Sequence, residues 1–391
     1  MLSALLADRK TEGLRFGRHN VLLGDIIHVI AEKIGYRPAG SIAETKAAAY
    51  VSSLWQKADV LHWTDTFQAY TRVTSFVPTL TCISVIAVLL IPVQTQLAFL
   101  VAVVGLAFAI VLLYADMPPT YRGKGSSQNV VAIRKPAQLA RRRVVLLAAL
   151  DTVSQPARWM PIRRSVLLLT IQVALLLLAL VDPLPLIDVF SAVPVAWLSA
   201  VPAGICVVVA CAELLLQRRE TTSGAVSHAS ALATMACVLD ELERLQYTEV
   251  WAVAIGASTT HAGILDLIQR YPFDGQSTFF VTLAGLGRGT FCYTVQEGYD
   301  RGRSVDPLLL ELATEMSPVV NIEARASKQS HLLRVLLRRQ YRAIELTCLD
   351  DIGFVPFQGQ AQDTAEMVSL PILERAVRAC VMLVKSIDAL N

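Results

Sequence analysis

Two long apolar blocks constrain this chain more than any other feature. Residues 73–115 contain no charged side chain, and residues 165–216 contain only Asp182, Asp188 and Glu213. A helix that crosses a membrane needs about 20 consecutive apolar residues. The blocks therefore predict two transmembrane helical hairpins, with four spans at about 76–93, 97–115, 165–181 and 193–216.

The composition and the flanking charges agree with that interpretation. The chain is 54% hydrophobic and 17% charged, whereas soluble domains usually have about 25% charged residues. Basic residues such as Arg72, Arg122 and Arg218 flank the blocks, and the turns within the blocks carry no Lys or Arg. The positive-inside rule then places every polar part on the cytoplasmic side. We expect an integral protein of the plasma (inner) membrane, with the lipid bilayer as a partner and no binding of nucleic acid.

The polar sequence falls into three parts, residues 1–72, 116–164 and 217–391. Short apolar runs at 144–150, 248–256, 278–285 and 341–349 are typical of buried parallel strands. Helical patterns occur at 41–57, 229–245, 262–271, 306–316, 327–338 and 369–389, and Ser41 with Glu44 forms a capping box. This alternation predicts one α/β domain with a sheet covered on both faces, assembled from all three parts and interrupted by the blocks at 73–115 and 165–216.

Six short segments stand in an informative order. They read YRPAGS (36–41), NVVA (129–132), VVLLAALD (144–151), GAVSHAS (224–230), EVWAVAIGAST (249–259) and TFFVTLAGLGRG (278–289). In this order they resemble metallopeptidase family 28, the di-zinc aminopeptidases. The resemblance implies a three-layer α/β/α domain with a mostly parallel central sheet. It also implies a site with two zinc ions, held by His and carboxylate ligands, and a Glu as general base.

The residues that match the family's ligand positions cannot bind zinc. These positions hold Ala149, Ser227, Ser258, Thr259 and Ala284, and only the supporting residue Asp151 is kept. The last His is replaced by the segment Gln-Gly-Gln at 358–360. Zinc in proteins takes Cys, His, Asp or Glu, so hydroxyl and methyl side chains do not substitute for the ligands. We therefore expect no catalytic residue, no metal and no cofactor.

The resulting hypothesis is a membrane-anchored pseudo-peptidase that serves as a binding or scaffolding module. A peptide, a small ligand or a protein partner would occupy the vestigial cleft, which is formed by Asp151, Ser227, His228, Ser258, Thr259, His261 and Ala284.

Several alternatives stay open. The main one is an active aminopeptidase or amidohydrolase whose zinc is relocated to His228 and His261, with Asp151 or Cys237 as a further ligand. A serine hydrolase could use Ser227, Ser258 and His261 as neighbours, but the chain has no G-x-S-x-G elbow. The Gly-rich segment 285–289 lacks the G-K-[ST] ending of a phosphate loop. The remaining histidines, including His331 in a basic helix, are expected to be solvated or structural.

Overall fold

The computed structural model of the chain describes residues 22–74, 77–90, 94–114, 120–152, 222–298, 302–328 and 330–390. The chain divides into two compact units. The first comprises residues 1–72, 122–154 and 220–391, and the second comprises residues 73–121 and 155–219.

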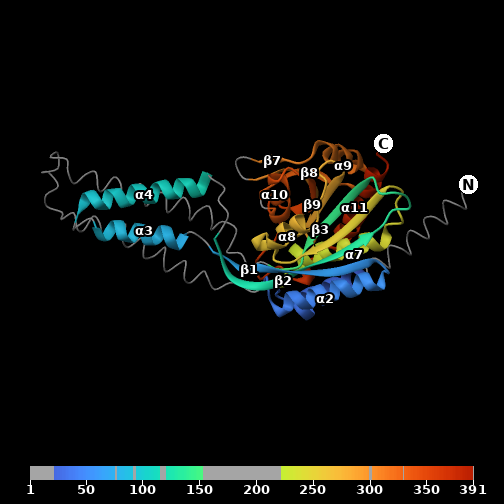
Figure 1. Cartoon of the computed structure of the whole chain (residues 1–391), viewed down its shortest axis with the longest axis horizontal. Coiled ribbons are helices and arrows are strands. Elements are labelled where there is room, and N and C mark those ends of the chain that lie inside the picture. Colours follow the sequence, from blue (N-terminus) through green and yellow to red (C-terminus); the bar gives the residue numbers. More distant parts are fainter. Residues whose placement is uncertain are drawn as a thin grey trace, which may run out of the picture. The chain divides into compact units, whose positions relative to one another are not determined.

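Within the described residues, the first unit contains a nine-stranded sheet in the order β1-β2-β4-β3-β5-β9-β6-β7, with β8 paired to β6 (Figure 1). The strands are β1 (Leu61–Thr74), β2 (Thr120–Arg134), β3 (Arg142–Ala149), β4 (Thr248–Ile255), β5 (Thr278–Ala284), β6 (Thr290–Glu297), β7 (Arg303–Ser304), β8 (Glu323–Ser327) and β9 (Arg342–Leu349). The four central strands β4, β3, β5 and β9 run parallel, whereas β2 and β6 run antiparallel to β4 and β9. The sheet is therefore mixed, and the expectation of a mostly parallel sheet holds only for its centre.

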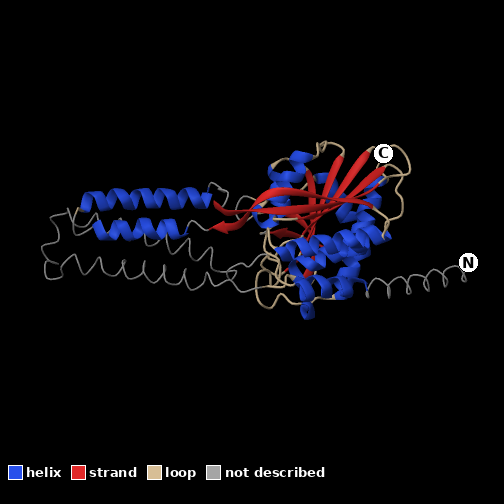
Figure 2. Ribbon diagram, turned by 60° about the horizontal axis from the view of Figure 1, so that its bottom comes forward, coloured by secondary structure: helices blue, strands red, loops and turns tan. Residues whose placement is uncertain are grey.

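Helices cover both faces of this sheet (Figure 2). The sheet lies between two apolar cores, and alternate residues of β3 face one or the other. Leu146 packs with the first apolar cluster and Leu147 with the second. The first core includes residues of α2 (Ile42–Lys57), α7 (Ser230–Glu241), α9 (Pro307–Val320) and α11 (Leu370–Asp388). The second includes residues of α8 (Ala262–Arg270) and α10 (His331–Arg338). Short helical turns complete the unit: η1 (His28–Ile34), η3 (Ala225–Ala229), η4 (Ser258–Thr260) and η5 (Ala365–Met367).

Local sequence explains where helix α2 begins. At α2, Ser41 Oγ accepts a hydrogen bond from Glu44 N at 3.1 Å, which confirms the predicted N-cap. The Glu44 carboxylate accepts from Gly40 N at 2.7 Å and also from Ala257 N at 2.8 Å. The cap therefore also anchors the loop that follows β4.

The prediction of four membrane spans is wrong. The first apolar block contains two helices that pack together, α3 (Val77–Leu90) and α4 (Thr95–Tyr114). Helix α3 has only 14 residues, fewer than the about 20 that a span requires. Across the part of the chain that the structure describes, no helix combines the length and the apolarity needed to cross a bilayer. This finding also overturns the expected integral location in the plasma (inner) membrane with a cytoplasmic domain. The spans predicted at 165–181 and 193–216 lie outside the described residues.

A buried carboxyl group lies beneath the amino end of α10. Glu345 of β9 is 2% exposed, and it accepts hydrogen bonds from Ser330 Oγ at 2.6 Å and from Thr282 Oγ1 at 3.2 Å. Burial raises the pKa of Glu345 to about 8, although the two hydroxyl groups oppose the shift. The folded state therefore keeps a proton that the unfolded state loses above its ordinary pKa of 4.5.

Glu345→Gln should become stabilising relative to the natural chain as pH rises. The natural chain loses stability between pH 4.5 and 8, because the unfolded state alone releases the proton there. At about 1.4 kcal/mol per unit of pKa, we expect the difference in unfolding free energy to move by roughly 3 kcal/mol in favour of the variant between pH 5 and pH 8. Urea unfolding at both pH values measures this, with the exposed Glu366→Gln as control. A difference that is independent of pH would contradict the assignment.

Candidate functional site

The residues predicted to form the cleft lie at the carboxyl ends of the central parallel strands. Asp151 follows β3, Ser258, Thr259 and His261 follow β4, and Ala284 ends β5. Ser227 and His228 lie in η3, whose carbonyl groups accept hydrogen bonds from Gly285 N and Gly287 N after β5. Open α/β sheets bind ligands outside the carboxyl ends of their strands. We call this region the strand-end site.

The carboxylate of Asp151 ties two loops of the strand-end site together. Asp151 is fully buried, and its Oδ1 accepts from Ser258 N at 2.8 Å. Its Oδ2 accepts from Thr259 Oγ1 at 2.8 Å and from Thr259 N at 3.3 Å. Both oxygens are thus engaged by Ser258 and Thr259, two of the residues at the expected ligand positions.

A second buried carboxylate, Asp363, holds η3. Its Oδ1 accepts from Val226 N at 2.6 Å and from Ser227 N at 3.3 Å, and its Oδ2 accepts from Ser227 Oγ at 2.5 Å. Ser227 Oγ also lies 2.6 Å from Nδ1 of His228. Asp363 was not predicted to belong to the site.

This arrangement differs from a hydrolase triad. In a triad the imidazole lies between the carboxylate and the serine, so that the carboxylate orients the base. Here the hydroxyl of Ser227 lies between Asp363 and His228. Because Ser227 has one proton and donates it to Asp363, Nδ1 of His228 must carry a hydrogen and donate to Ser227. The geometry therefore does not support Ser227 as an activated nucleophile.

Three histidines lie close to one another in this region with their pKa values lowered, and Asp151 interacts with two of them, His228 and His261. Burial lowers the pKa of His228 to about 4. Burial, and then the nearby His331, Arg334 and Arg338, lower the pKa of His261 to about 3. The rings of His261 and His331 are 6.0 Å apart between centroids, and the pKa of His331 falls to about 4 through burial and Arg334. His331 begins α10 and was not predicted to belong to the site.

Arg37 connects the loops beneath the strand-end site. The side chain is fully buried. Its Nη1 donates to the carbonyl oxygens of Ile30 at 2.7 Å, Gly35 at 2.6 Å and Ser223 at 3.0 Å, and its Nε donates to that of Leu150 at 3.0 Å. Burial lowers the pKa of Arg37 to about 10, and Asp151 and Asp363 oppose this shift. The guanidinium therefore stays charged at neutral pH beside two buried carboxylates.

Comparisons with solved structures identify the architecture. A zinc aminopeptidase from Bacillus subtilis aligns over 94% of both chains with a TM-score of 0.57 and 11% identity. An aminopeptidase from Aneurinibacillus sp. strain AM-1 aligns over 94% of this chain and 92% of its own, with a TM-score of 0.55 and 12% identity. The chain has the fold of the zinc aminopeptidases. A glutaminyl cyclase from Fimbriiglobus ruber shares it, with 94% of both chains covered, a TM-score of 0.54 and 10% identity. At these identities the likeness shows the fold alone. No protein-family model matches the sequence, and no curated protein matches it either.

Within the zinc-aminopeptidase fold, the residues present do not fit a di-zinc centre. The positions expected to supply ligands carry methyl or hydroxyl groups, at Ala149, Ser227, Ser258, Thr259 and Ala284. The two carboxylates nearby, Asp151 and Asp363, are each held by three hydrogen bonds to amides and hydroxyls. Among the described residues, no three His, Cys, Asp or Glu side chains are grouped so as to hold a metal ion. No catalytic step through zinc is therefore derived from these residues.

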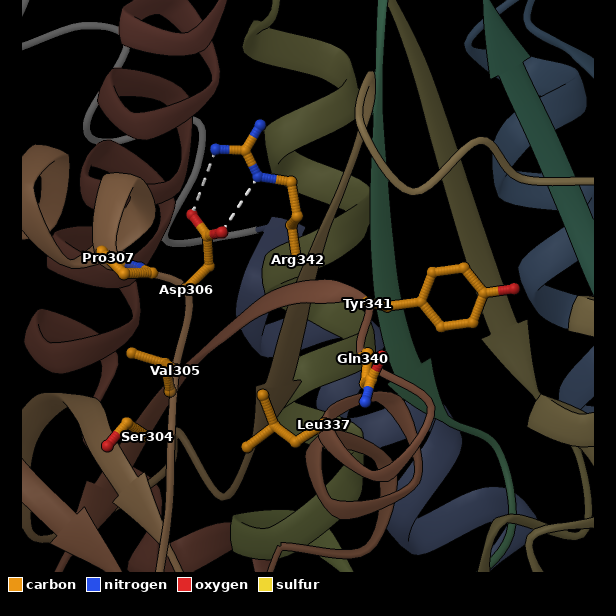
Figure 3. Close-up of a pocket in the computed structure, with 8 residues that line it drawn as sticks. All are labelled: Ser304, Val305, Asp306, Pro307, Leu337, Gln340, Tyr341 and Arg342. Carbon is orange, nitrogen blue, oxygen red and sulfur yellow. Dashed lines mark hydrogen bonds and ion pairs between the residues drawn. The ribbon is translucent and has the colours of Figure 1, made fainter.

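Two surface hollows lie at the opposite, amino ends of the parallel strands. One measures about 230 Å³ and is lined by Asp306, Arg342 and their neighbours (Figure 3). There Arg342 Nε donates to Asp306 Oδ2 at 2.9 Å, so the principal charges of this hollow already neutralise each other. The second hollow is lined by three cations for which the described residues show no ion pair, and it is considered below.

Gly224 gives a test of how tightly the strand-end site is packed. Its φ is +65°, and a Cβ there would lie 2.3 Å from Cγ2 of Thr152 and 3.3 Å from Nη2 of Arg37. We expect Gly224→Ala to lower the free energy of unfolding by about 2 kcal/mol, through backbone strain and overpacking. Gly275→Ala is the matched control, because a Cβ at Gly275 meets open space. Equal urea midpoints for the two variants would show that this packing is not tight.

Proposed function

We propose that this chain is a metal-free pseudo-peptidase that binds a peptide end at the strand-end site without hydrolysing it. The observation that carries the proposal is the hydrogen bonding of Asp151 and Asp363. The two carboxylates hold the loops together by accepting hydrogen bonds from backbone amides and from the hydroxyls of Ser227 and Thr259. Ser227, Ser258 and Thr259 stand at the positions where a zinc aminopeptidase would need free metal ligands.

The chemistry left at the site suits recognition better than hydrolysis. Peptide hydrolysis in this fold requires an activated water and a titratable base beside it. None of the expected ligand positions carries a titratable side chain, and the pKa of His228 near 4 makes it a weak proton acceptor. Neutral imidazoles and hydroxyls can instead donate and accept hydrogen bonds with a peptide terminus. The aminopeptidases that share the fold support a peptide as the ligand class.

Calorimetric titration with short peptides tests the proposal. A panel of dipeptides with free or blocked ends should include a ligand that binds equally well with zinc and with a chelator. Chromatography should show no cleavage of that ligand. The double variant His261→Ala, His331→Ala should weaken binding at least about tenfold, the loss of roughly 1.4 kcal/mol expected for one or two hydrogen bonds. Arg270→Gln on α8 is the control and should bind as the natural chain does. Zinc-dependent cleavage would contradict the proposal, and so would the absence of binding by every peptide.

One observation favours the alternative of a relocated metal at His228 and His261. The Nδ1 atom of His261 is buried and has no hydrogen-bond partner among the described residues, as a nitrogen awaiting a metal would be. Under this alternative, the double variant His228→Ala, His261→Ala would abolish a zinc-dependent hydrolysis. Under the pseudo-peptidase proposal there is no such activity to lose.

A further inference from the structure

The second hollow, which we call the basic hollow, has an unbalanced charge. It measures about 250 Å³ and lies where the end of β2 meets the start of β1 and the turn after α7. Its lining residues are Asp59, Val60, Leu61, Ile133, Arg134, Lys135 and Arg244. Three cations therefore face one carboxylate, a net charge of +2. Across the described residues, no ion pair neutralises any of the three cations.

The two guanidinium groups are held in place before any ligand arrives. Arg134 Nη2 donates to the carbonyl oxygen of Leu239 at 2.7 Å, and Arg244 Nε donates to that of Pro136 at 3.3 Å. Each guanidinium uses one nitrogen for this hydrogen bond, and its other N–H groups remain available to a ligand.

The backbone around the basic hollow is also fixed. Ala137 N donates to Leu245 O at 2.7 Å, and Gln138 N donates to Gln246 O at 3.0 Å. The nearby acid Asp388 does not compete for the cations, because it accepts from the backbone amides of Gln246 and Tyr247, each at 2.8 Å. The arginines therefore project from a rigid frame, which lowers the entropy lost on binding.

We propose that the basic hollow is a binding site for a small molecule that carries a dianionic phosphate group. Two anchored guanidiniums and one ammonium match the geometry and the charge of a phosphate. The net charge of +2 favours a dianion over a singly charged carboxylate. Val60, Leu61 and Ile133 give the hollow an apolar wall for the rest of the molecule, and Asp59 can accept from a hydroxyl or amine on it. This site is separate from the strand-end site and does not depend on the function proposed there.

Titration of the full chain with inorganic phosphate at low ionic strength tests this inference. We expect saturable binding that acetate at equal ionic strength does not reproduce. Arg244→Gln, at an exposed side chain, should weaken phosphate binding at least about tenfold, and Arg134→Gln should do the same. Asp59→Asn should strengthen binding a few-fold, because it removes the opposing carboxylate. Arg270→Gln, at a cation paired with Asp266 on α8, should leave phosphate binding unchanged.

The outcomes are distinct. If acetate bound as tightly as phosphate, the ligand would belong to the carboxylates, and the inference of a phosphate ligand would be wrong. Absence of saturable phosphate binding, or binding that survives in the double variant Arg134→Gln, Arg244→Gln, would overturn the inference. Because Arg244 is exposed, its variant should fold even if Arg134→Gln loses stability through its bond to Leu239.

Discussion

Arg37→Met should lower the free energy of unfolding by about 4 kcal/mol, as expected when one member of a buried charged network is removed. The variant leaves the carbonyl groups of Ile30, Gly35, Leu150 and Ser223 without their shared donor. It also removes a buried cation that interacts electrostatically with the carboxylates of Asp151 and Asp363. Urea unfolding at pH 7 measures the loss.

Two further variants make this test specific to the buried network. Arg288→Met, at an exposed arginine, should change stability by less than about 0.5 kcal/mol. Arg37→Lys keeps the charge, but its single ammonium group cannot reach all four carbonyl groups as the planar guanidinium does, so its loss should fall between the other two. If Arg37→Met cost less than about 1 kcal/mol, a typical value for one ordinary hydrogen bond, the guanidinium would not be what holds these loops.

Acidification from pH 6.5 to pH 4 should destabilise the chain through His228. The folded pKa near 4 lies below the ordinary value of 6.5, so the unfolded state binds a proton in this range while the folded state does not. The stability from the neutral imidazole is present above pH 6.5 and is lost as pH falls. At about 1.4 kcal/mol per pKa unit, the loss approaches 3 kcal/mol at pH 4. His261 and His331 have lowered pKa values and act in the same direction.

The comparison of His228→Gln with the natural chain isolates this effect from that of Glu345, which has the opposite sign. The variant should be the less stable chain at pH 7, because it loses the contact with Ser227, and the difference should shrink or reverse by pH 4.5. His62→Gln serves as control, since His62 lies in β1 and contacts Val60 O. A difference between His228→Gln and the natural chain that stays constant from pH 7 to 4.5 would contradict the lowered pKa.

The sequence predicted the centre of the sheet well and its margins poorly. The apolar runs at 144–150, 248–256, 278–285 and 341–349 coincide with β3, β4, β5 and β9, because strands covered on both faces are continuously apolar. The edge strand β1 and the strand β6 were not predicted. Exposed residues such as Thr66 and Gln68 alternate with partly buried ones along β1, so its apolar signal is half as strong.

The block at 73–115 misled for a different reason. An apolar composition does not determine how many residues a helix will contain, and α3 as described has 14 residues, fewer than the about 20 that a span needs. The strand-end site shows a related limit. Motif order brought Asp151, Ser258 and Thr259 together correctly, but Asp363 contacts Ser227 across 136 residues, and His331 lies beside His261 only after folding. Local patterns do not encode such contacts.

Metal stoichiometry tests the central claim most directly. The full chain should be purified without added zinc or chelator and measured by elemental mass spectrometry. Because its ligand positions carry hydroxyl and methyl groups, we expect less than about a tenth of an equivalent of zinc or any other transition metal. About one equivalent, lost in the double variant His228→Ala, His261→Ala, would contradict the metal-free account and establish a rebuilt metal site.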